Sequence, residues 1–567
     1  MNRDYATSTT GLRSFVHGYG LITVVYCLGT YFTSPWLMGD TVDYVSSIIA
    51  FENGQYLQFW EFGHLFWRPL GWLLFRLSNP LTSVLFNANA YLKVTAILLV
   101  VNWIAGLGVV LLLHTLTMRL CNRPWIINLT TIGFIFSAGF LDYSQTGSAY
   151  VPGLAFILLG AYQLIKNHEN PRAYRSWCAG FTFAVGVCFW FPLVLIIPAA
   201  LLLPWFLYGV QLRTSRYLIQ AALACAVFLI IAYGGVVFVL RIHNLDQLLA
   251  WVTASSHGMN RMRGVPRMVY GFSNSIIDLS GDGALFKRFL KHDPFNPVSL
   301  GEVLRLSLWK LAFSYLFLSV VVLNLLRSKN RARLFALLAV DLIPTVLFAL
   351  FVFEAGDTSR YLASLPLLFF ILAASLCTEG TALWVRVLAV AFIGITVITN
   401  VQVMSASTLN RRQQSVAQRV QPLLPLLKPE SRVVTSHLQD ELNNFTRDFP
   451  FNPINRDRNL QYYAVLAVNT AQIERWREDF ATMALSVWAK GGDIWLSRRL
   501  FEPRPKPQWG WVEGDDSRIS WADLSSFFSE FQVGESVGGD DGFILMPPSE
   551  TNKRIVTQVV SHQLTNR

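Results

Sequence analysis

Long apolar stretches separated by short polar loops make up most of the first 403 residues. Tyr217–Leu240 contains no charged residue, and Leu92–Leu113 contains only Lys93. A helix needs about 20 apolar residues to cross the hydrocarbon core of a bilayer. About eleven stretches approach this length, near residues 15–33, 91–116, 125–141, 148–166, 174–190, 191–209, 217–240, 306–326, 332–353, 359–377 and 383–403. The pattern predicts a polytopic α-helical membrane protein with about 11 transmembrane helices.

The division at Phe191–Pro192 is the least sharp of these boundaries. Pro192, Pro198 and Pro204 each lack a backbone donor, and such prolines kink or break a helix. Residues 181–210 can therefore also be interpreted as one long broken helix.

Basic residues cluster in alternate connections between the apolar stretches. These residues are Arg119, Arg123, Lys166, Arg172, Arg175, Arg213, Arg216, Arg327, Lys329, Arg331, Arg333 and Arg386. The short loops 142–147 and 353–358 contain neither Lys nor Arg. The positive-inside rule places the basic loops in the cytoplasm. The loops 34–90 and 241–305 and the tail after residue 404 are then expected on the other side.

The polar tail, residues 404–567, differs in pattern from the preceding transmembrane module, residues 1–403. Strands are predicted at Arg432–Ser436, Asp493–Leu496 and Phe543–Met546, and an amphipathic helix at Ala471–Lys490. Residues 513–517 and 538–542 have loop composition. We expect a small α/β extracytoplasmic domain of about 150 residues, a usual domain size.

Composition agrees with a membrane protein and argues against a nucleic-acid-binding one. The chain is 53% hydrophobic and 14% charged, whereas soluble proteins carry about 25% charged residues. The net charge of +11 is distributed at the ends of the apolar stretches. All six cysteines lie in or beside these stretches, without disulfide-framework or zinc-site spacing. We interpret them as small packed side chains.

The first candidate site follows the first apolar stretch, at Asp40, Asp43, Tyr44 and Ser47. These residues recur at helical spacing, so they form one polar face of a helix expected to lie along the membrane interface. Asp40 is the candidate catalytic base. A structural alternative is that Asp40 caps the helix, with Asp43 completing a capping box.

Glu61, His64 and Arg68 form the second candidate group in the same loop. Their spacings of three and four residues place them on one face if the segment is helical. A polar surface facing the substrate is the preferred interpretation. Glu61 and His64 can also be two ligands of a divalent metal, and Arg68 can be a residue whose charge reaches the membrane rim.

The third candidate group, His257, Arg261 and Arg263, lies in the second long loop beside Gly258 and Gly264. Guanidinium groups hold phosphate with paired hydrogen bonds, and glycines let backbone amides approach the same anion. The alternative is that a long translocated loop simply tolerates basic residues.

The fourth group, Arg360–Tyr361, leads from an outer turn into a late apolar stretch. Arg360 at a helix start is opposed by the helix dipole. It is better explained by a pairing with a phosphate, or by a salt bridge to Asp357 or Glu354.

Together these residues resemble the GT-C superfamily of integral-membrane glycosyltransferases, in the branch of protein O-mannosyltransferases and lipid A aminoarabinose transferases. Asp40 and Tyr44 are similar to the family's acidic motif after the first span, whose Asp is the proposed base. Thr41 stands where that motif has a second acidic residue, so no cofactor and no metal site are predicted. Arg68–Pro69–Leu70 and Arg360–Tyr361 with Pro366 are similar to two further motifs.

The resemblance implies inverting transfer of a sugar from a polyprenyl-phosphate donor to a hydroxyl acceptor of a glycan, lipid or protein. Arg261, Arg263 and Arg360 would hold the leaving phosphate, and the reaction would take place at the extracytoplasmic face, in a bacterial inner membrane.

Two alternatives are a transporter or flippase of an anionic lipid, and a polysaccharide polymerase or ligase. Transporters place charged residues near the middle of the membrane. Lys93, Asp142 and Asp341 are expected near the ends of spans, which favours an enzyme.

Overall fold

A computed structural model describes most of the chain. The described residues are 9–33, 39–52, 54, 59–86, 90–209, 212–254, 265–279, 285, 289, 298–327, 331–351, 359–378, 380–413, 422–435, 462–465, 475–502, 521–539 and 542–565.

A helix occupies each stretch that the hydrophobic pattern selects. In chain order these are α1 (Thr9–Phe32), α4 (Ala90–Leu120), α5 (Pro124–Ile135), α7 (Tyr150–Glu169), α8 (Ala173–Phe189), α9 (Ile197–Tyr208), α10 (Leu212–Val239), α15 (Trp309–Leu326), α16 (Arg331–Phe351), α18 (Leu365–Cys377) and α19 (Leu383–Gln413). The protein is therefore a polytopic helical membrane protein.

Six helices in the described part of the chain are long and apolar enough to cross a membrane. They are Lys93–Leu120, Phe191–Tyr208, Ser215–Val239, Leu300–Leu326, Arg331–Leu350 and Leu383–Ser405. Gly18–Phe32, Pro124–Ile135 and Leu365–Cys377 are shorter apolar helices. The count of about eleven spans stays a prediction.

Two expected spans are interrupted, and the region 174–209 is divided where the sequence predicts a boundary between two spans. The 125–141 stretch is divided into α5 and α6 (Ala138–Tyr143). Between α8 and α9 the chain forms the 3-10 helix η2 (Phe191–Ile196), so the 174–209 segment is two helices. The 359–377 stretch begins as the short helix α17 (Ser359–Leu362) and continues as α18. Pro192 and Pro366, each near the start of the element that follows the break, fit the preference of proline for the first helical turn.

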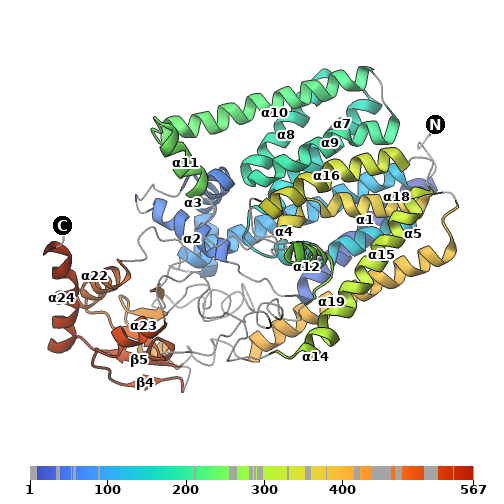
Figure 1. Cartoon of the computed structure of the whole chain (residues 1–567). Coiled ribbons are helices and arrows are strands. Elements are labelled where there is room, and N and C mark those ends of the chain that lie inside the picture. The colour runs from blue at the N-terminus through green and yellow to red at the C-terminus, as the bar shows by residue number, and fades with distance from the viewer. Residues whose placement is uncertain are drawn as a thin grey trace.

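The remaining membrane-domain elements lie in or beside the long loops. They are α2 (Gly39–Glu52), the 3-10 helix η1 (Phe62–His64), α3 (Trp67–Phe86), α11 (Leu245–Ala254), α12 (Val265–Ile276), α14 (Leu300–Val303) and the π-helical turn η3 (Leu304–Leu308). Figure 1 shows the apolar helices running alongside one another, with α2, α3 and α11 toward one end of the bundle. The C-terminal domain lies at that same end.

Small residues set the closest helix contacts. A methyl group added at Gly153 would lie 2.9 Å from the carbonyl oxygen of Gly186, and one at Gly186 would lie 2.8 Å from that of Gly153. On the other side of α8, a methyl group at Gly180 would meet the backbone oxygen of Ala221 at 2.2 Å. Helices pack in membranes through such small-residue contacts. These glycines therefore let α8 approach both α7 and α10.

Two buried asparagines bind backbone groups where helices end. The Asn102 amide of α4 donates to the carbonyl of Tyr143 at 2.6 Å and to that of Thr146. The Asn400 amide of α19 donates to the carbonyls of Phe136 (2.6 Å) and Ile276 (2.8 Å), and its oxygen accepts from the backbone amide of Asp278. Unpaired peptide groups are costly in an apolar interior. The asparagines therefore stabilise the breaks in the helices.

Two expectations are corrected here. Cys121 and Cys377 form a disulfide between the end of α4 and the end of α18, with Cα atoms 5.9 Å apart, so not all six cysteines are simply packed. Sequence spacing missed the pair because 256 residues separate the partners. Asp341 was expected near a span end. It lies midway along α16, which begins at Arg331 and ends at Phe351.

The C-terminal domain contains a mixed five-stranded sheet in the order β2-β1-β3-β5-β4. Its strands are β1 (Arg432–Thr435), β2 (Tyr462–Ala464), β3 (Ile494–Ser497), β4 (Ser536–Val537) and β5 (Phe543–Met546). β1 is parallel to β2 and β3, and β5 is antiparallel to β3 and β4. The helices are α22 (Trp476–Ala489), α23 (Trp521–Phe528) and α24 (Glu550–Thr565), with short 3-10 helices η4 (Leu424–Leu426) and η7 (Arg498–Phe501).

Buried aromatic residues fill the core of this domain, among them Phe480, Phe527 and Phe528 against Leu496 and Met546. The three strands predicted from the sequence are present, and α22 lies within the predicted helix, beginning at Trp476. Residues 466–474 lie outside the described residues. The domain boundary at residues 403 and 404 stays a prediction.

Replacing Gly180 by alanine should destabilise the protein by about 1–3 kcal/mol, the usual cost of overpacking. The new methyl group meets backbone rather than a side chain that can rotate away. Thermal unfolding of the purified protein in detergent measures the effect. Gly234→Ala in α10 is the control, because no heavy atom lies within 4 Å of its added methyl group. Equal melting temperatures for the two variants would contradict the proposed α8–α10 contact.

Candidate active site at the start of α2

Asp40 lies in the first turn of α2 and is partly exposed. The helix begins at Gly39, so Asp40 is inside it and is not its N-cap. The hydroxyl of Tyr150, the first residue of α7, donates a hydrogen bond to Oδ2 of Asp40. Asp40 therefore has one oxygen held by a neutral donor, which leaves the carboxylate able to accept a proton from another partner.

Asp43, one turn further along α2, has a different environment. Arg68 of α3 forms ion pairs with both Asp43 and Glu61, and the three residues are only 1%, 4% and 9% exposed, respectively. Burial disfavours the charged guanidinium, but the two carboxylates more than offset this and raise the pKa of Arg68. The capping-box role considered for Asp43 is thus replaced by a buried ion-pair triad, which we call the Arg68 triad.

Aromatic rings surround the Arg68 triad and connect it to Asp40. The guanidinium of Arg68 lies 5.0 Å from the ring centre of Tyr44, a distance that suits a cation–π contact. The His64 ring lies 5.3 Å from Tyr44 and 5.7 Å from Tyr150, measured between ring centres. Tyr150 also packs against Trp190 at 4.6 Å. The cluster therefore forms a continuous wall of rings beside the acidic groups.

His64 is held in one protonation state. Its Nδ1 lies 2.9 Å from the carbonyl oxygen of Phe189, which can only accept, so Nδ1 carries the proton. Burial lowers the pKa of His64, despite opposing effects of Glu61 and Asp40. The ring is therefore neutral at pH 7, and its Nε2 is a hydrogen-bond acceptor.

The loop before α7 is held by hydrogen bonds to α2, α3 and α4. The backbone amide of Gly147 donates to Oγ1 of Thr41 at 3.1 Å, and the Trp67 indole donates to the carbonyl of Gly147 at 2.9 Å. A methyl group at Gly147 would lie 2.5 Å from Cγ2 of Thr41. Asn102 binds the same loop through Tyr143 and Thr146. Glycine is therefore required where this loop touches α2.

Several buried polar atoms have no hydrogen-bond partner within the described part of the chain. In the site they are the hydroxyl groups of Tyr44 and Ser47 and Nε of Arg68. Buried polar groups of this kind are costly unless a water or ligand satisfies them. The site can therefore accept polar groups of a substrate.

The structure brings together six of the residues predicted for the site: Asp40, Asp43, Tyr44, Glu61, His64 and Arg68. Tyr361 is fully buried in α17 against Phe272 of α12, at 5.7 Å between ring centres. α17 and α12 both contact α6, the helix that precedes Tyr150 in the chain. Arg360 lies in α17, and its side chain is not described; His257, Arg261 and Arg263 lie outside the described residues.

The sequence analysis did not identify Tyr150, Trp67 or Gly147. Tyr150 is 110 residues from Asp40 in the chain. Tyrosine is common where a membrane span meets the interface, so its place at the start of an apolar stretch suggested no other role. Pro152 in the first turn of α7 indicates where the helix starts. It does not indicate which other segment of the protein packs against that start.

Metal ligation through Glu61 and His64 would require further ligands and rearranged contacts. Glu61 pairs with Arg68, and His64 donates to Phe189. No group of three or more His, Cys, Asp or Glu side chains suited to a metal occurs among the described residues. Glu61 and His64 are thus engaged in an ion pair and a hydrogen bond within the site.

Replacing Arg68 by methionine should destabilise the protein by about 3–5 kcal/mol, because two buried carboxylates lose their counter-ion. Thermal unfolding in detergent, followed by tryptophan fluorescence, measures the loss. The control is Arg76→Met: Arg76 pairs with Glu52 at 2.8 Å, but its side chain is 57% exposed, so about 0–1 kcal/mol is expected. A fully stable Arg68→Met protein would show that the triad does not hold α2 to α3.

The chain was compared with known sequences and with solved structures, and only the structures gave matches. No protein-family model and no curated protein matches the chain. The structure is similar to that of ArnT from Cupriavidus metallidurans bound to undecaprenyl phosphate, with a TM-score of 0.55 and 10% identity over 96% of this chain and 99% of that chain. ArnT from the same organism in the apo state gives a TM-score of 0.44, with 11% identity over 95% and 98% of the two chains. The first of these similarities shows that the chain shares the overall fold of this ArnT structure along nearly its whole length.

Proposed function

We propose that the protein is an inverting glycosyltransferase that moves a sugar from a polyprenyl-phosphate donor to a hydroxyl acceptor at the extracytoplasmic membrane face. One observation carries the proposal. Of the three clustered carboxylates, Asp43 and Glu61 are buried against Arg68, whereas Asp40 is partly exposed and hydrogen-bonded to a neutral tyrosine. Asp40 is therefore the carboxylate best suited to act as a base.

In the proposed reaction, Asp40 accepts the proton of the acceptor hydroxyl while that oxygen attacks the anomeric carbon. The bond between this carbon and the phosphate oxygen breaks, and the prenyl phosphate leaves with the electron pair. Attack opposite the leaving group inverts the configuration. Arg261, Arg263 and Arg360 are proposed to bind the phosphate and stabilise its growing charge, and His257 is proposed to lie beside them.

The other predicted residues are proposed to form the sugar-binding wall. The Tyr44 hydroxyl has no partner among the described residues and can bind a sugar hydroxyl. Because two carboxylates bind Arg68, its proposed role is to position Asp43 and Glu61 rather than to hold phosphate. Neutral His64 offers an acceptor, and Tyr361 is proposed to support Arg360 from within α17.

The architecture supports an enzyme that works at the edge of the membrane. Asp40 and the Arg68 triad come from α2, the residue before η1, and α3, none of which belongs to the six candidate spans in the described residues. The ArnT structure of similar fold contains bound undecaprenyl phosphate, which supports a donor of that class. The placement of Asp341 within α16 favours the transporter alternative, but this residue is distinct from the cluster that holds Asp40.

Asp40→Asn should lower the rate of transfer by about 10²–10⁴-fold, because the amide cannot accept the proton. Release of prenyl phosphate from synthetic prenyl-phosphate sugars, followed by mass spectrometry, measures the rate. Asp246→Asn replaces an exposed acid in the first turn of α11 and should retain activity. Near-normal turnover by a folded Asp40→Asn protein would remove Asp40 from the mechanism. Transport of intact donor without release would support the transporter instead.

Tyr150→Phe should lower kcat about tenfold with little change in KM, because it removes one hydrogen bond that orients the Asp40 carboxylate. The same assay at varied donor concentration separates the two constants. Tyr162→Phe, at a tyrosine more than three turns further along α7, is the matched control. Unchanged kcat in Tyr150→Phe would show that the contact has no role in catalysis.

A further inference from the structure

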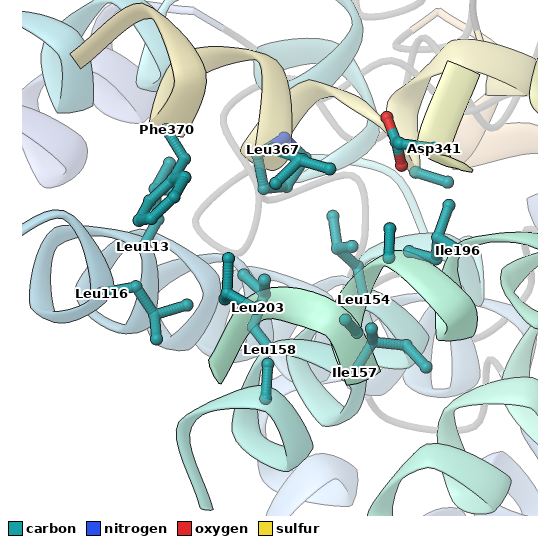
Figure 2. A pocket seen from close by; sticks show the side chains of 15 residues that line it. Leu113, Leu116, Leu154, Ile157, Leu158, Ile196, Leu203, Asp341, Leu367 and Phe370 are labelled. Atoms are coloured by element: carbon teal, nitrogen blue, oxygen red, sulfur yellow. The ribbon is translucent and has the colours of Figure 1, made fainter. Parts of the chain in front are cut away.

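Two buried charged groups of the membrane domain have partners within the protein. Arg68 forms ion pairs with Asp43 and Glu61. Asp341, which Figure 2 shows at the edge of a small apolar space, is hydrogen-bonded to Ser364. These groups are therefore explained by the structure that surrounds them. A pair of arginines at the other end of the bundle from α2 and α3 is not.

Arg123 and Arg386 lie near each other at the starts of two helices. Arg123 immediately precedes α5, and Arg386 is in the first turn of α19, which packs against α5. The charge of Arg123 acts on Arg386, so the two guanidinium groups repel each other. Neither forms an ion pair in the described part of the chain, and Nε of Arg386 is shielded from solvent without a hydrogen-bond partner there. The pair is thus an unbalanced concentration of positive charge.

The backbone that carries the two arginines is held in place. The disulfide between Cys121 and Cys377 joins the connection before α5 to the end of α18, with Cα atoms 5.9 Å apart. The Asn324 amide of α15 donates to the carbonyl and the hydroxyl of Ser375, at 2.9 Å each, and to the Thr381 hydroxyl at 3.3 Å. These contacts fix the turn from α18 to α19. Groups that are already in position bind a ligand at a lower cost in conformational entropy.

Exposed apolar side chains surround the arginine pair. Trp125 is 45% exposed, Trp384 57% and Leu383 74%. Val387 and Val390 continue the exposed surface from Leu383 at helical spacing along α19. Tryptophan is enriched where membrane spans meet the lipid headgroups. The pair therefore lies at headgroup depth, at the end of a surface suited to hydrocarbon chains.

We propose that Arg123 and Arg386 bind the phosphate of an anionic phospholipid, whose acyl chains lie along the exposed apolar face of α19. Guanidinium groups hold phosphate oxygens through paired, charge-assisted hydrogen bonds. An anion at the start of α5 and α19 is also favoured by the helix dipoles, which oppose the arginines alone. The ligand balances the charge that the described residues leave unpaired.

This lipid site is distinct from the candidate active site. The start of α4, around Val94, packs against Tyr44 of α2, whereas Arg123 follows the other end of this 31-residue helix. A helix of that length spans about 45 Å. Figure 1 shows α5 at the opposite end of the bundle from α2 and α3. Binding at the arginine pair therefore does not depend on the proposed sugar transfer.

The affinity is tested on the full chain in detergent, titrated with dioleoyl phosphatidylglycerol and followed by native mass spectrometry. Arg123→Gln and Arg386→Gln should each weaken binding about tenfold, because each removes charge-assisted hydrogen bonds. Dioleoyl phosphatidylcholine has the same chains but no net charge, and it should bind the unaltered protein about tenfold more weakly. Equal binding of the two lipids would overturn the proposal.

The matched control is Arg216→Gln, which removes another exposed arginine without an ion pair, from α10. It should leave the affinity nearly unchanged. An equal loss in all three variants would assign the binding to the general positive charge of the protein and would overturn a site at the arginine pair. Melting temperatures confirm that each variant is folded.

A phosphatidylglycerol with a diazirine in one acyl chain locates the bound lipid. In phosphatidylcholine vesicles that contain the protein, irradiation should label the α19 peptide with Val387 and Val390, and Arg386→Gln should remove this label. Labelling confined to other helices would contradict the site. Displacement by inorganic phosphate, but not by chloride at the same ionic strength, would assign the arginines to free phosphate. Either result would overturn the proposal, whatever the outcome of the sugar-transfer assay.

Discussion

The buried interaction of Arg68 with Asp43 and Glu61 is the constraint on which the site depends. It joins α2, the residue before η1 and α3. It adds a buried connection to the more exposed contacts of Glu52 in α2 with Trp72 and Arg76 in α3. An isolated charge cannot remain in such a buried place, so each of the three residues requires the others. By holding two carboxylates, Arg68 also separates their chemistry from that of Asp40, which accepts a hydrogen bond from the neutral hydroxyl of Tyr150. One cation thus determines both the local fold and which acid is available for reaction.

The membrane part of the fold is built to bring irregular backbone close to this triad. Membrane helices ordinarily satisfy their own peptide groups, and breaks require partners from elsewhere. Asn102 binds carbonyls of the segment that carries Gly147, and Asn400 binds carbonyls at the ends of α5 and α12. Gly147 then allows α2 to approach within contact of that segment. Buried amides and a glycine therefore place Tyr150 opposite Asp40, although their positions in the chain are far apart.

The same helices carry a second acidic group in a very different environment. Asp341 faces an apolar cavity rather than a cation, and no basic side chain occurs among the described residues that line this space. In the Arg68 triad, charge is balanced by ion pairs within the protein, whereas Oδ2 of Asp341 has no hydrogen-bond partner among the described residues.

The sequence by itself determined the class of the protein, because twenty-residue apolar stretches can satisfy the hydrophobic thickness of a bilayer in only one way. It also located a helix in each predicted span, three strands of the C-terminal sheet, and the segment that contains Asp40 and Arg68. These features depend on local composition and period. Motif spacing further indicated the GT-C resemblance, and the chain shares the fold of an ArnT structure.

Only the tertiary structure decided which of these side chains meet. Tyr150 and Asp40 are 110 residues apart in the chain, and Cys121 and Cys377 are 256 apart. Arg68 is 25 residues from Asp43 and 7 from Glu61. No periodic pattern encodes such contacts, because they arise from how helices pack rather than from how each one forms. The mid-span position of Asp341 shows the same limit: hydropathy detects the span, but the function of a charge within it depends on the neighbours that packing supplies.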